Sequence, residues 1–423
     1  MTSASPVWHP FTQHGVQPEA IPIARAEGPW LETVDGRRIF DAISSWWVVT
    51  HGHRHPHIVQ AIREQADRLD QVIFAGFTHD PAEKLARQLV AMTPPGLEYV
   101  FFSDSGSTSV EVALKMALGF WRNRGERRSR ILALEGAYHG DTIGGMSVGE
   151  RSVFNAPYAP LLFDVERIPF PAAGREQIAL DAITTACRNA GVAALIVEPL
   201  ILGAGGMLIY PAWVLAEMKR ICEVHGVLLI ADEVMTGWGR TGTRFACEQA
   251  DVTPDIACYS KGLTGGSLPL AVTLCRADIF DAHYSTDRSK TFFHSSSYTA
   301  NPIACAAACA NLEIWQDEPV MERIAAIISA QTKGLDRFRE DRRFSNVRQI
   351  GTIVALDIAT DDAGYLASIG PRLYNDFLGR GLLIRPLGNT IYLMPPYCST
   401  PHELDRVFNA ISEIVDGLDK SGS

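Results

Sequence analysis

The sequence predicts an α/β protein that has a large domain built on a mainly parallel sheet and a smaller α+β domain. Three observations predict this fold class: a length of 423 residues, an alternation of apolar and amphipathic segments from about residue 98, and a change of pattern near residue 319. A chain of this length has room for two domains. Its apolar residues, 47% of the total, are enough to build large cores.

The alternating part of the chain predicts the large domain. Short apolar runs typical of buried strands occupy residues 99–104, 130–136, 193–199, 226–234, 255–260 and 268–275. Amphipathic helical patterns lie between several of them, at residues 105–121 and 212–226 for example. Strands that alternate with helices indicate helices packed on a largely parallel sheet.

A different pattern follows residue 319 and predicts the smaller domain. A long amphipathic stretch over residues 321–341 leads to short strands around residues 347–359, 382–387 and 389–396, and then to a final helix. We therefore expect a large domain over residues 56–318 and a small domain over residues 319–423. We expect residues 1–55 to contribute to the small domain and to the active site.

Composition excludes several classes of function. A net charge of −10 with no block of lysine and arginine argues against a nucleic-acid partner. The start of the chain lacks the pattern of a signal peptide, and the most apolar stretch, residues 193–218, is interrupted by Glu198, two prolines and three glycines. We expect a cytoplasmic protein without membrane segments. The eight cysteines form no C-x-x-C pair, which favours free buried thiols over disulfides or a zinc site.

The stretch PDIACYSKGLTGG places Lys261 at the end of an apolar strand. A lysine there is costly unless it is paired or used chemically. The glycines that follow allow a backbone or a flat ligand to approach closely. A surface lysine at the start of a loop is the simpler alternative, and the other motifs decide between the two interpretations.

The stretch SDSGSTSVE joins a strand to a helix and is a candidate phosphate site. Free N–H groups at the start of a helix, with the helix dipole behind them, bind anions. Gly106 would let the anion approach the backbone, and Ser107 could add a hydroxyl donor. Taken alone, simple capping of the helix by Ser105 or Ser107 is the plainer interpretation. The stretch lacks the first glycine of a G-x-S-x-G elbow, which argues against a serine hydrolase.

The stretch LLIADEVMTGWGRTG ends an apolar strand with Asp232 and Val234 on one face. A carboxylate at this place could hold a protonated ring nitrogen while the aliphatic side chain packs on the ring, although an aspartate that caps the next turn is also common. The literal G-x-G-x-x-G from Gly237 to Gly242 follows the strand too late and opens no clear helix. We therefore reject a nicotinamide site.

Two histidine-containing stretches remain. In GAYHGDTIGGMS, Tyr138 could stack on a flat ligand, or it could be incidental to a turn. In HGHRHPH, residues 51–57, four histidines lack helical spacing and nearby acidic or thiol partners. We expect a hydrogen-bonded loop there and assign no metal.

Four of these motifs suit the parts of one cofactor, pyridoxal 5'-phosphate. Gly106 and Ser107 suit its phosphate, and Tyr138 suits its ring face. Asp232 suits its pyridine nitrogen and would keep the ring an electron sink. Lys261 would form a Schiff base with the aldehyde and then move the proton between carbons, helped by burial that favours its neutral form.

At this point the chain resembles the class III aminotransferases of fold type I over nearly its whole length. The resemblance rests on DEVMTGWGRTG, YSKGLTGG and HSSSYTANPIACAAA. Within the class it is most similar to the biotin-pathway branch, on WHPFTQ, SSWWVVTHG, AMTPPGLEYVFFSDSGS, YHGDT and IRPLGNTIYLMPPY. That branch uses S-adenosylmethionine as amino donor and 8-amino-7-oxononanoate as acceptor, and it is a homodimer.

The resemblance also implies roles for further residues. Trp46 and Tyr138 would line the substrate site, with Tyr392 nearby, and Arg385 would take the substrate carboxylate. Ser296 and Ser297 would reach the cofactor phosphate of the partner subunit. Ser295 would lie near the substrate, and Asp141 and Arg240 would belong to the surroundings of the site. An aromatic slot with one fixed arginine also suits a long apolar keto acid.

Two departures from the family pattern concern substrate recognition. Many members have tyrosine where this chain has Phe11, and the usual H-G-P-T is here H-S-S-S. Another class III ω-aminotransferase, acting on an amine or ω-amino acid, would share every cofactor residue and is the alternative function. An aminomutase with the same fold ranks below it. A regulator with the aminotransferase fold ranks below it too, because such regulators carry an added DNA-binding domain and this chain has no spare basic segment for one.

Overall fold

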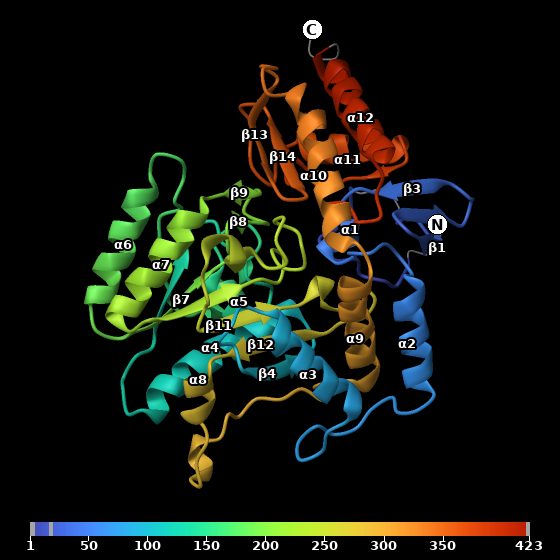
Figure 1. The fold of residues 1–423 in the computed structure, drawn as a ribbon. Helices are drawn as coiled ribbons and strands as arrows, with labels where there is room; N and C mark the ends of the chain where they lie inside the picture. The colour runs from blue at the N-terminus through green and yellow to red at the C-terminus, as the bar shows by residue number, and fades with distance from the viewer. Residues whose placement is uncertain (1–4, 17–19, 420–423) are drawn as a thin grey trace.

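The computed structural model describes residues 5–16 and 20–419 of the chain, and it is mixed α/β as the sequence predicts (Figure 1). The largest sheet has seven strands in the order β4-β12-β11-β10-β7-β5-β6. Only β12 runs antiparallel to its neighbours, so the sheet is mainly parallel. Its strands are β4 (Tyr99–Ser103), β5 (Arg130–Leu134), β6 (Glu166–Ile168), β7 (Val192–Val197), β10 (Leu228–Asp232), β11 (Ile256–Tyr259) and β12 (Ala271–Cys275).

Helices cover both faces of this sheet, which is why the central strands are apolar throughout. One face packs on α4 (Gly106–Asn123). The opposite face packs on α6 (Glu176–Arg188) and α7 (Ala212–His225) at one half, and on α3 (Asp80–Met92) and α9 (Pro302–Asp317) at the other. The remaining elements of this part are α2 (Pro56–Ala66), α5 (Ile143–Val148), α8 (Ala277–Asp281), η1 (Ala156–Leu161), η2 (Ala246–Ala250), η3 (Lys261–Thr264), η4 (Arg288–Lys290), β8 (Ile201–Leu202) and β9 (Leu208–Ile209).

The C-terminal part forms a second group of elements, drawn in orange and red in Figure 1. Its three-stranded antiparallel sheet has the order β13-β14-β16. The strands and helices are β13 (Phe344–Ile350), β14 (Ile353–Ile358), β16 (Thr390–Leu393), α10 (Val320–Asp336), α11 (Ile369–Gly379) and α12 (Pro401–Asp419). These agree with the strands and helices expected after residue 319.

The N-terminal strands join this C-terminal part. Strand β15 (Leu382–Leu383) pairs in parallel with β3 (Arg38–Asp41). Strand β3 pairs in turn with β2 (Trp30–Thr33), and β2 with β1 (Ile23–Glu27), both antiparallel. A short irregular turn, α1 (Ser44–Trp47), follows β3 and carries positive φ angles at Ser44, Ser45 and Trp47. This pairing is what the expected division of the chain requires, and its boundaries at residues 55 and 318 stay a prediction.

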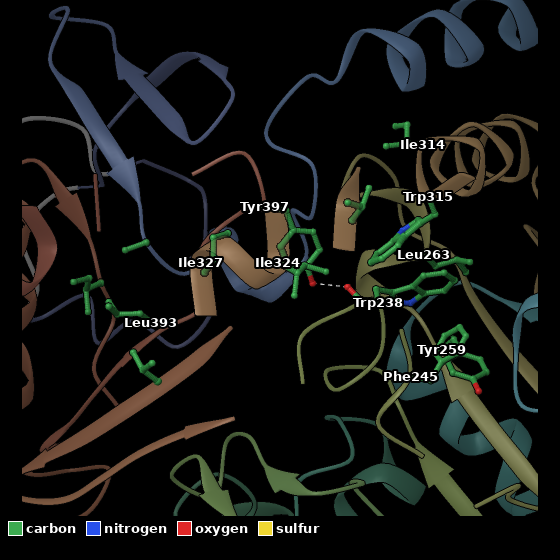
Figure 2. Packing of buried hydrophobic residues seen from close by; sticks show 14 of the residues in the cluster. Trp238, Phe245, Tyr259, Leu263, Ile314, Trp315, Ile324, Ile327, Leu393 and Tyr397 are labelled. Atoms are coloured by element: carbon green, nitrogen blue, oxygen red, sulfur yellow. Dashed lines mark hydrogen bonds between the residues drawn. The ribbon is translucent and has the colours of Figure 1, made fainter. Parts of the chain in front are cut away.

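The core crosses the expected boundary near residue 318. Trp315 of α9 and Ile324 of α10 belong to the same buried cluster as Trp238 and Tyr259 (Figure 2). The Tyr397 hydroxyl donates a hydrogen bond to the Trp238 carbonyl across this contact. The two parts of the chain therefore share one continuous apolar cluster, which fixes the position of the C-terminal residues beside the end of the large sheet.

Four features outside the candidate site bear on the expectations from the sequence. All eight cysteines are free and seven are buried, which confirms the expected thiols. The four histidines of residues 51–57 face different partners: His51 packs on Trp315, and the others contact Asp41, Glu318 and Glu313. Over residues 5–16 and 20–419, no group of three histidine, cysteine or acidic side chains is arranged to hold a metal. None of the helices described in that range combines the length and apolarity needed to cross a bilayer.

Candidate active site

The carboxyl ends of three adjacent strands meet at one edge of the large sheet. Strands β7 and β10 are parallel, with Val197 opposite Ala231, and β10 pairs with β11 through Asp232 and Cys258. Glu198, Asp232 and the segment that leads to Lys261 consequently emerge side by side. The carboxyl ends of parallel strands are where ligands bind in sheets of this kind.

Lys261 begins a tight turn that the rest of the protein holds in place. Its φ angle is 47°, a left-handed conformation that a lysine seldom adopts. The buried Asn311 side chain of α9 donates hydrogen bonds to the carbonyls of Gly262 and Leu263, at 3.0 and 3.1 Å. Gly266, with φ +87°, lies so close to the Val48 carbonyl that a Cβ atom would come within 2.7 Å of it. The glycines after Lys261 thus admit a neighbouring backbone, one of the two uses expected from the sequence.

The surroundings of Lys261 favour a neutral amine. Burial lowers the pKa of Lys261 to about 8, although the nearby Asp232 and Glu198 carboxylates oppose the shift. The Lys261 Nζ atom lies 4.7 Å from the centre of the Trp47 ring. Trp47 is therefore part of the site.

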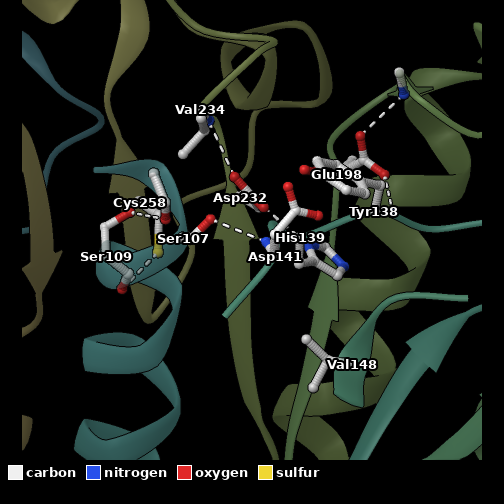
Figure 3. A network of polar contacts seen from close by, with 12 residues as sticks. Ser107, Ser109, Tyr138, His139, Asp141, Val148, Glu198, Asp232, Val234 and Cys258 are labelled. Carbon is white, nitrogen blue, oxygen red and sulfur yellow. Dashed lines mark hydrogen bonds and ion pairs between the residues drawn. The ribbon is translucent and has the colours of Figure 1, made fainter. Parts of the chain in front are cut away.

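Asp232 is anchored by a histidine and a backbone N–H (Figure 3). Its Oδ2 atom lies 2.7 Å from His139 Nδ1, and its Oδ1 atom accepts a hydrogen bond from the Val234 N–H at 3.1 Å. Both side chains are buried. A buried carboxylate held in this way has a fixed direction, which suits a group that must meet one ring nitrogen. The predicted site residues omitted His139, although it stands in the same YHGDT stretch as Tyr138.

Glu198 is a second buried carboxylate that the predicted site residues omitted. It accepts hydrogen bonds from the N–H groups of Tyr138 and Gly203, each at 2.9 Å. Burial raises the pKa of Glu198 to about 7. The signal that could have identified it is the one used for Asp232, an acidic residue that directly follows an apolar strand. Glu198 links the Tyr138 loop to the loop after β8 and so holds two walls of the site together.

The start of α4 has the geometry expected of an anion site and is also capped. Ser105 is the N-cap residue, and it exchanges reciprocal hydrogen bonds with Thr108. The N–H groups of Gly106 and Ser107 precede any intrahelical partner, and no other acceptor for them appears among the described backbone contacts. Ser107 accepts a hydrogen bond from the Asp141 N–H at 3.2 Å. Capping and anion binding are therefore compatible here, because they use different groups.

Close packing fixes this helix start against its neighbours. A Cβ atom at Gly106 would come within 2.6 Å of Val234 Cγ1, and one at Gly140 within 2.0 Å of Ser107 Oγ. Gly140 also has a φ angle of +105°, which favours glycine. Gly106, Ser107, Val234 and the Tyr138–Asp141 loop are thus in direct contact, as the sequence motifs require of one site.

Aromatic residues and one arginine form the outer wall. Burial, followed by the charge and hydrogen bonding of Asp141, raises the pKa of the Tyr138 phenol above its usual range. The Phe11 ring lies edge-on to Trp46 at 5.6 Å. The Arg385 guanidinium is 5.5 Å from the Trp46 ring and donates a hydrogen bond to the Phe11 carbonyl at 3.0 Å. Trp47 donates from Nε1 to the Tyr392 hydroxyl at 3.0 Å.

Arg240, which we expected in the surroundings of the site, is held by backbone groups. It is buried, and its guanidinium donates to the carbonyls of Pro395, Val49 and Trp47. These bonds tie Arg240 to the backbone around Trp47, and its role toward a substrate stays a prediction.

Residues 295–297 lie on the surface of the single chain. Ser297 offers its carbonyl to Gln71, and Ser296 bonds with Thr299 and Tyr298. Ser295 bonds only locally, to Ser296. Within the described part of the chain these serines make no contact with the Lys261 cluster, so their predicted role across a subunit interface remains a prediction.

A cavity of about 320 Å³ opens beside the cluster. It includes Tyr138 and Asp141, and it extends outward to Phe154 and Tyr365, but Lys261 and Asp232 are not among its described walls. The cavity therefore adjoins the strand-end cluster through Tyr138 and could hold the part of a substrate distant from the reacting atoms. Its walls are residues 136–138, 140, 141, 146, 149, 150, 152, 154, 155, 204–206, 208, 357, 364, 365, 387 and 390.

Comparison with known proteins identifies the class to which this fold and site belong. The family model for class III aminotransferases matches residues 11–415, and the chain belongs to that family. It is therefore an aminotransferase.

Within the family, the chain is similar over its full length to one named group. It is 48% identical to the adenosylmethionine-8-amino-7-oxononanoate aminotransferase of Synechococcus elongatus, with 99% of this chain and 100% of that protein covered. It is 39% identical to the enzyme of the same name from Nitratidesulfovibrio vulgaris, and the match covers 99% of this chain and 82% of that protein.

Solved structures agree with this grouping. The crystal structure of adenosylmethionine-8-amino-7-oxononanoate aminotransferase from Methanocaldococcus jannaschii matches with a TM-score of 0.93 at 34% identity, covering 97% of each chain. A second match is an amine transaminase from an uncultivated Pseudomonas species, in a form bound to pyridoxal phosphate. Its TM-score is 0.90 at 31% identity, and the match covers 97% of this chain and 98% of that chain. Both confirm the α/β fold class.

Proposed function

We propose that this aminotransferase moves an amino group from S-adenosylmethionine to 8-amino-7-oxononanoate and so makes 7,8-diaminononanoate for biotin synthesis. The observation that carries the proposal is the 48% identity over the whole chain to a relative named for this reaction. The slot formed by Trp46, Phe11 and Arg385 supports it, because a long apolar keto acid needs apolar walls and one cation.

We propose pyridoxal 5'-phosphate as the cofactor, and the residues of the site fit it. Asp232 would hold the pyridine nitrogen, Tyr138 and Val234 would enclose the ring, and the Gly106 and Ser107 N–H groups would bind the phosphate. The cofactor supplies an electron sink for the carbon that loses its proton. Lys261 Nζ, whose neutral form burial favours, would accept the proton from the donor's reacting carbon. In the second half of the reaction it moves a proton in the opposite direction.

We also propose a homodimer with the active sites at its interface, in which Ser296 and Ser297 reach the partner's phosphate site. Large apolar side chains are exposed in the single chain, among them Trp8, Phe77, Phe293 and Tyr298. Contiguous exposed apolar surface is typical of subunit contacts. Eight free cysteines support a reducing, cytoplasmic location.

The donor half of the reaction tests this function directly. Cofactor-loaded protein is mixed with S-adenosylmethionine alone, and the absorbance band of the bound cofactor is followed. We expect the band to disappear and to return when 8-amino-7-oxononanoate is added, since each substrate drives one half-reaction.

A second candidate is an ω-aminotransferase acting on simple amines, which the 31% identity to the Pseudomonas amine transaminase favours. An unchanged band with S-adenosylmethionine, together with its loss on adding a simple amine, would establish that activity and contradict our proposal.

The carboxylate assignment has its own test. Arg385→Lys keeps the charge but loses the planar fork that binds a carboxylate through two hydrogen bonds. We expect the KM for 8-amino-7-oxononanoate to rise about tenfold or more. An unchanged KM would remove Arg385 from carboxylate binding.

A further inference from the structure

An aromatic pair from two segments that are distant in sequence lines part of the cavity. The Phe154 and Tyr365 rings meet edge-on with centroids 4.4 Å apart, and both line the cavity. Phe154 also contacts Phe11, with ring centroids 5.9 Å apart. A continuous row of aromatic rings thus runs from Trp46 through Phe11 and Phe154 to Tyr365.

Tyr365 is held firmly in this place by its loop. Gly364 has a φ angle of +95° and donates its N–H to Asn389 Oδ1 at 3.1 Å. A Cβ atom at Gly388 would lie 1.7 Å from the Gly364 carbonyl, so the two backbones are in close contact. The Ser368 N–H and hydroxyl both bond Asp362, which closes the loop on the other side. Tyr365 is therefore presented to the cavity by a fixed backbone.

The Tyr365 hydroxyl differs from the other polar groups around it. The Asp357 carboxylate already accepts from Arg348, Thr390 and Asn346, and the Asn155 side chain bonds Glu150 and Ser152. Over residues 5–16 and 20–419, no group forms a hydrogen bond with the Tyr365 hydroxyl. A phenol without a partner, at the wall of a cavity, is available to a ligand.

Arg385 and Tyr365 are connected by a series of contacts: Arg385 bonds the Phe11 carbonyl, the Phe11 ring contacts Phe154, and Phe154 packs on Tyr365. Burial is the main cause that raises the pKa of Tyr392 above its usual range, while Arg385 lowers that pKa and Tyr365 raises it. Arg385 uses Nη2 on the Phe11 carbonyl, which leaves its other N–H groups for a ligand. The guanidinium of Arg385 and the phenol of Tyr365 are thus two donors available to a carboxylate in this region.

We propose that the Tyr365 hydroxyl donates a hydrogen bond to the carboxylate of the keto-acid acceptor and, together with Arg385, selects substrates that carry an acid at the end remote from the reacting carbonyl. This inference rests on the proposed function for the identity of the acid. Phe11 lacks a hydroxyl, and Tyr365 places one at the far end of the same row of rings.

The test compares Tyr365→Phe with the wild type in the cofactor-loaded protein. Calorimetric titration gives the Kd of 8-amino-7-oxononanoate and of its methyl ester, and steady-state assays give KM and kcat for the acid. The substitution keeps the ring that packs on Phe154 and removes only the hydroxyl. We expect the Kd and KM for the acid to rise about tenfold, with kcat within about twofold of the wild type, because a hydrogen bond to a charged group is lost. For the ester we expect equal Kd values in both proteins.

The control is Tyr374→Phe, which removes a hydroxyl from α11, outside the walls of the cavity, and should bind the acid like the wild type. An unchanged Kd for the acid in Tyr365→Phe, or an equal rise for acid and ester, would overturn the inference. Measurements on the wild-type protein distinguish a failure of this inference from a failure of the proposed function. Wild-type protein that binds the acid but shows no amino transfer from S-adenosylmethionine contradicts the donor assignment alone, and wild-type protein that does not bind the acid overturns both.

Discussion

At the scale of single residues, the site depends on buried groups whose protonation the fold has shifted. Burial lowers the pKa of Lys261 to about 8 and raises the pKa of Glu198 to about 7. Both shifts favour the neutral form, as expected when charged groups leave water. Asp232 is tied to His139, so one acidic group at this edge is oriented while the amine beside it becomes nucleophilic.

The lowered pKa of Lys261 predicts how the cofactor-free protein captures pyridoxal phosphate. Only the neutral amine attacks an aldehyde, so the capture rate should rise as the pH rises through about 8. With a lysine of ordinary pKa, the capture rate would rise only at a pH of about 10.4. Stopped-flow absorbance between pH 6 and 10 measures the midpoint, and Lys261→Ala, which should form no borohydride-reducible adduct, is the control. A midpoint near 10 would show that burial does not govern this amine.

At the scale of elements, two neighbouring residues at the start of α4 have separable roles. Ser105 caps the helix, while Gly106 allows Val234 to pack against the helix start. We expect Ser105→Ala to lower the free energy of unfolding by about 1 kcal/mol. Gly106→Ala should weaken the binding of pyridoxal phosphate by about tenfold or more, because the added methyl displaces Val234 and crowds the anion site.

Denaturant unfolding and cofactor titration of both variants measure these two effects. If Gly106→Ala binds the cofactor as tightly as the wild type, the start of α4 is not the phosphate site. If Ser105→Ala alone weakens cofactor binding, with unchanged stability, the assignment of the two roles is reversed.

The Arg240 side chain holds the irregular turn α1 in place. Its guanidinium joins the carbonyls of Trp47 and Val49 to that of Pro395, so it fixes the irregular turn that carries Trp47 over Lys261. Arg240→Met should leave these buried carbonyls without donors and lower the free energy of unfolding by about 3 kcal/mol. Chemical denaturation measures the free energy of unfolding. Arg244→Met is the control, because it makes the same substitution at a nearby position. A stability like that of the wild type would show that water replaces the guanidinium and that the turn does not need it.

At the scale of the whole molecule, the proposed exchange of serines between subunits can be tested by mixing inactive proteins. Lys261→Ala lacks the amine, and Ser297→Asp would place a negative charge beside the phosphate. If Ser297 acts on the partner's site, a mixed dimer collects both defects in one site and leaves the other intact. We expect activity to return on mixing, to about a quarter of the wild-type level when subunits exchange at random. Mixtures that stay inactive, although subunit exchange is shown by mass, would place Ser297 in the site of its own chain.

The order of apolar strands and amphipathic helices was enough to predict the large sheet and its mostly parallel direction, because local periodicity reports which face of each element is buried. The motifs at the ends of β4, β10 and β11 were enough to predict Gly106, Asp232 and Lys261 as parts of one site, since strand ends of a parallel sheet meet at one edge. The family was also evident from these stretches, and the comparisons confirm it.

Only the tertiary structure decided the roles of residues whose partners are distant in sequence. Trp47 lies over Lys261, His139 orients Asp232, and Arg240 supports the backbone turn that carries Trp47. Tyr365 reaches the cavity because its loop packs on the backbone of Gly388, which no local pattern encodes. The sequence determined what each segment forms by itself, through periodicity and strand-end chemistry. The structure decided which of those segments meet, because that depends on packing among elements hundreds of residues apart.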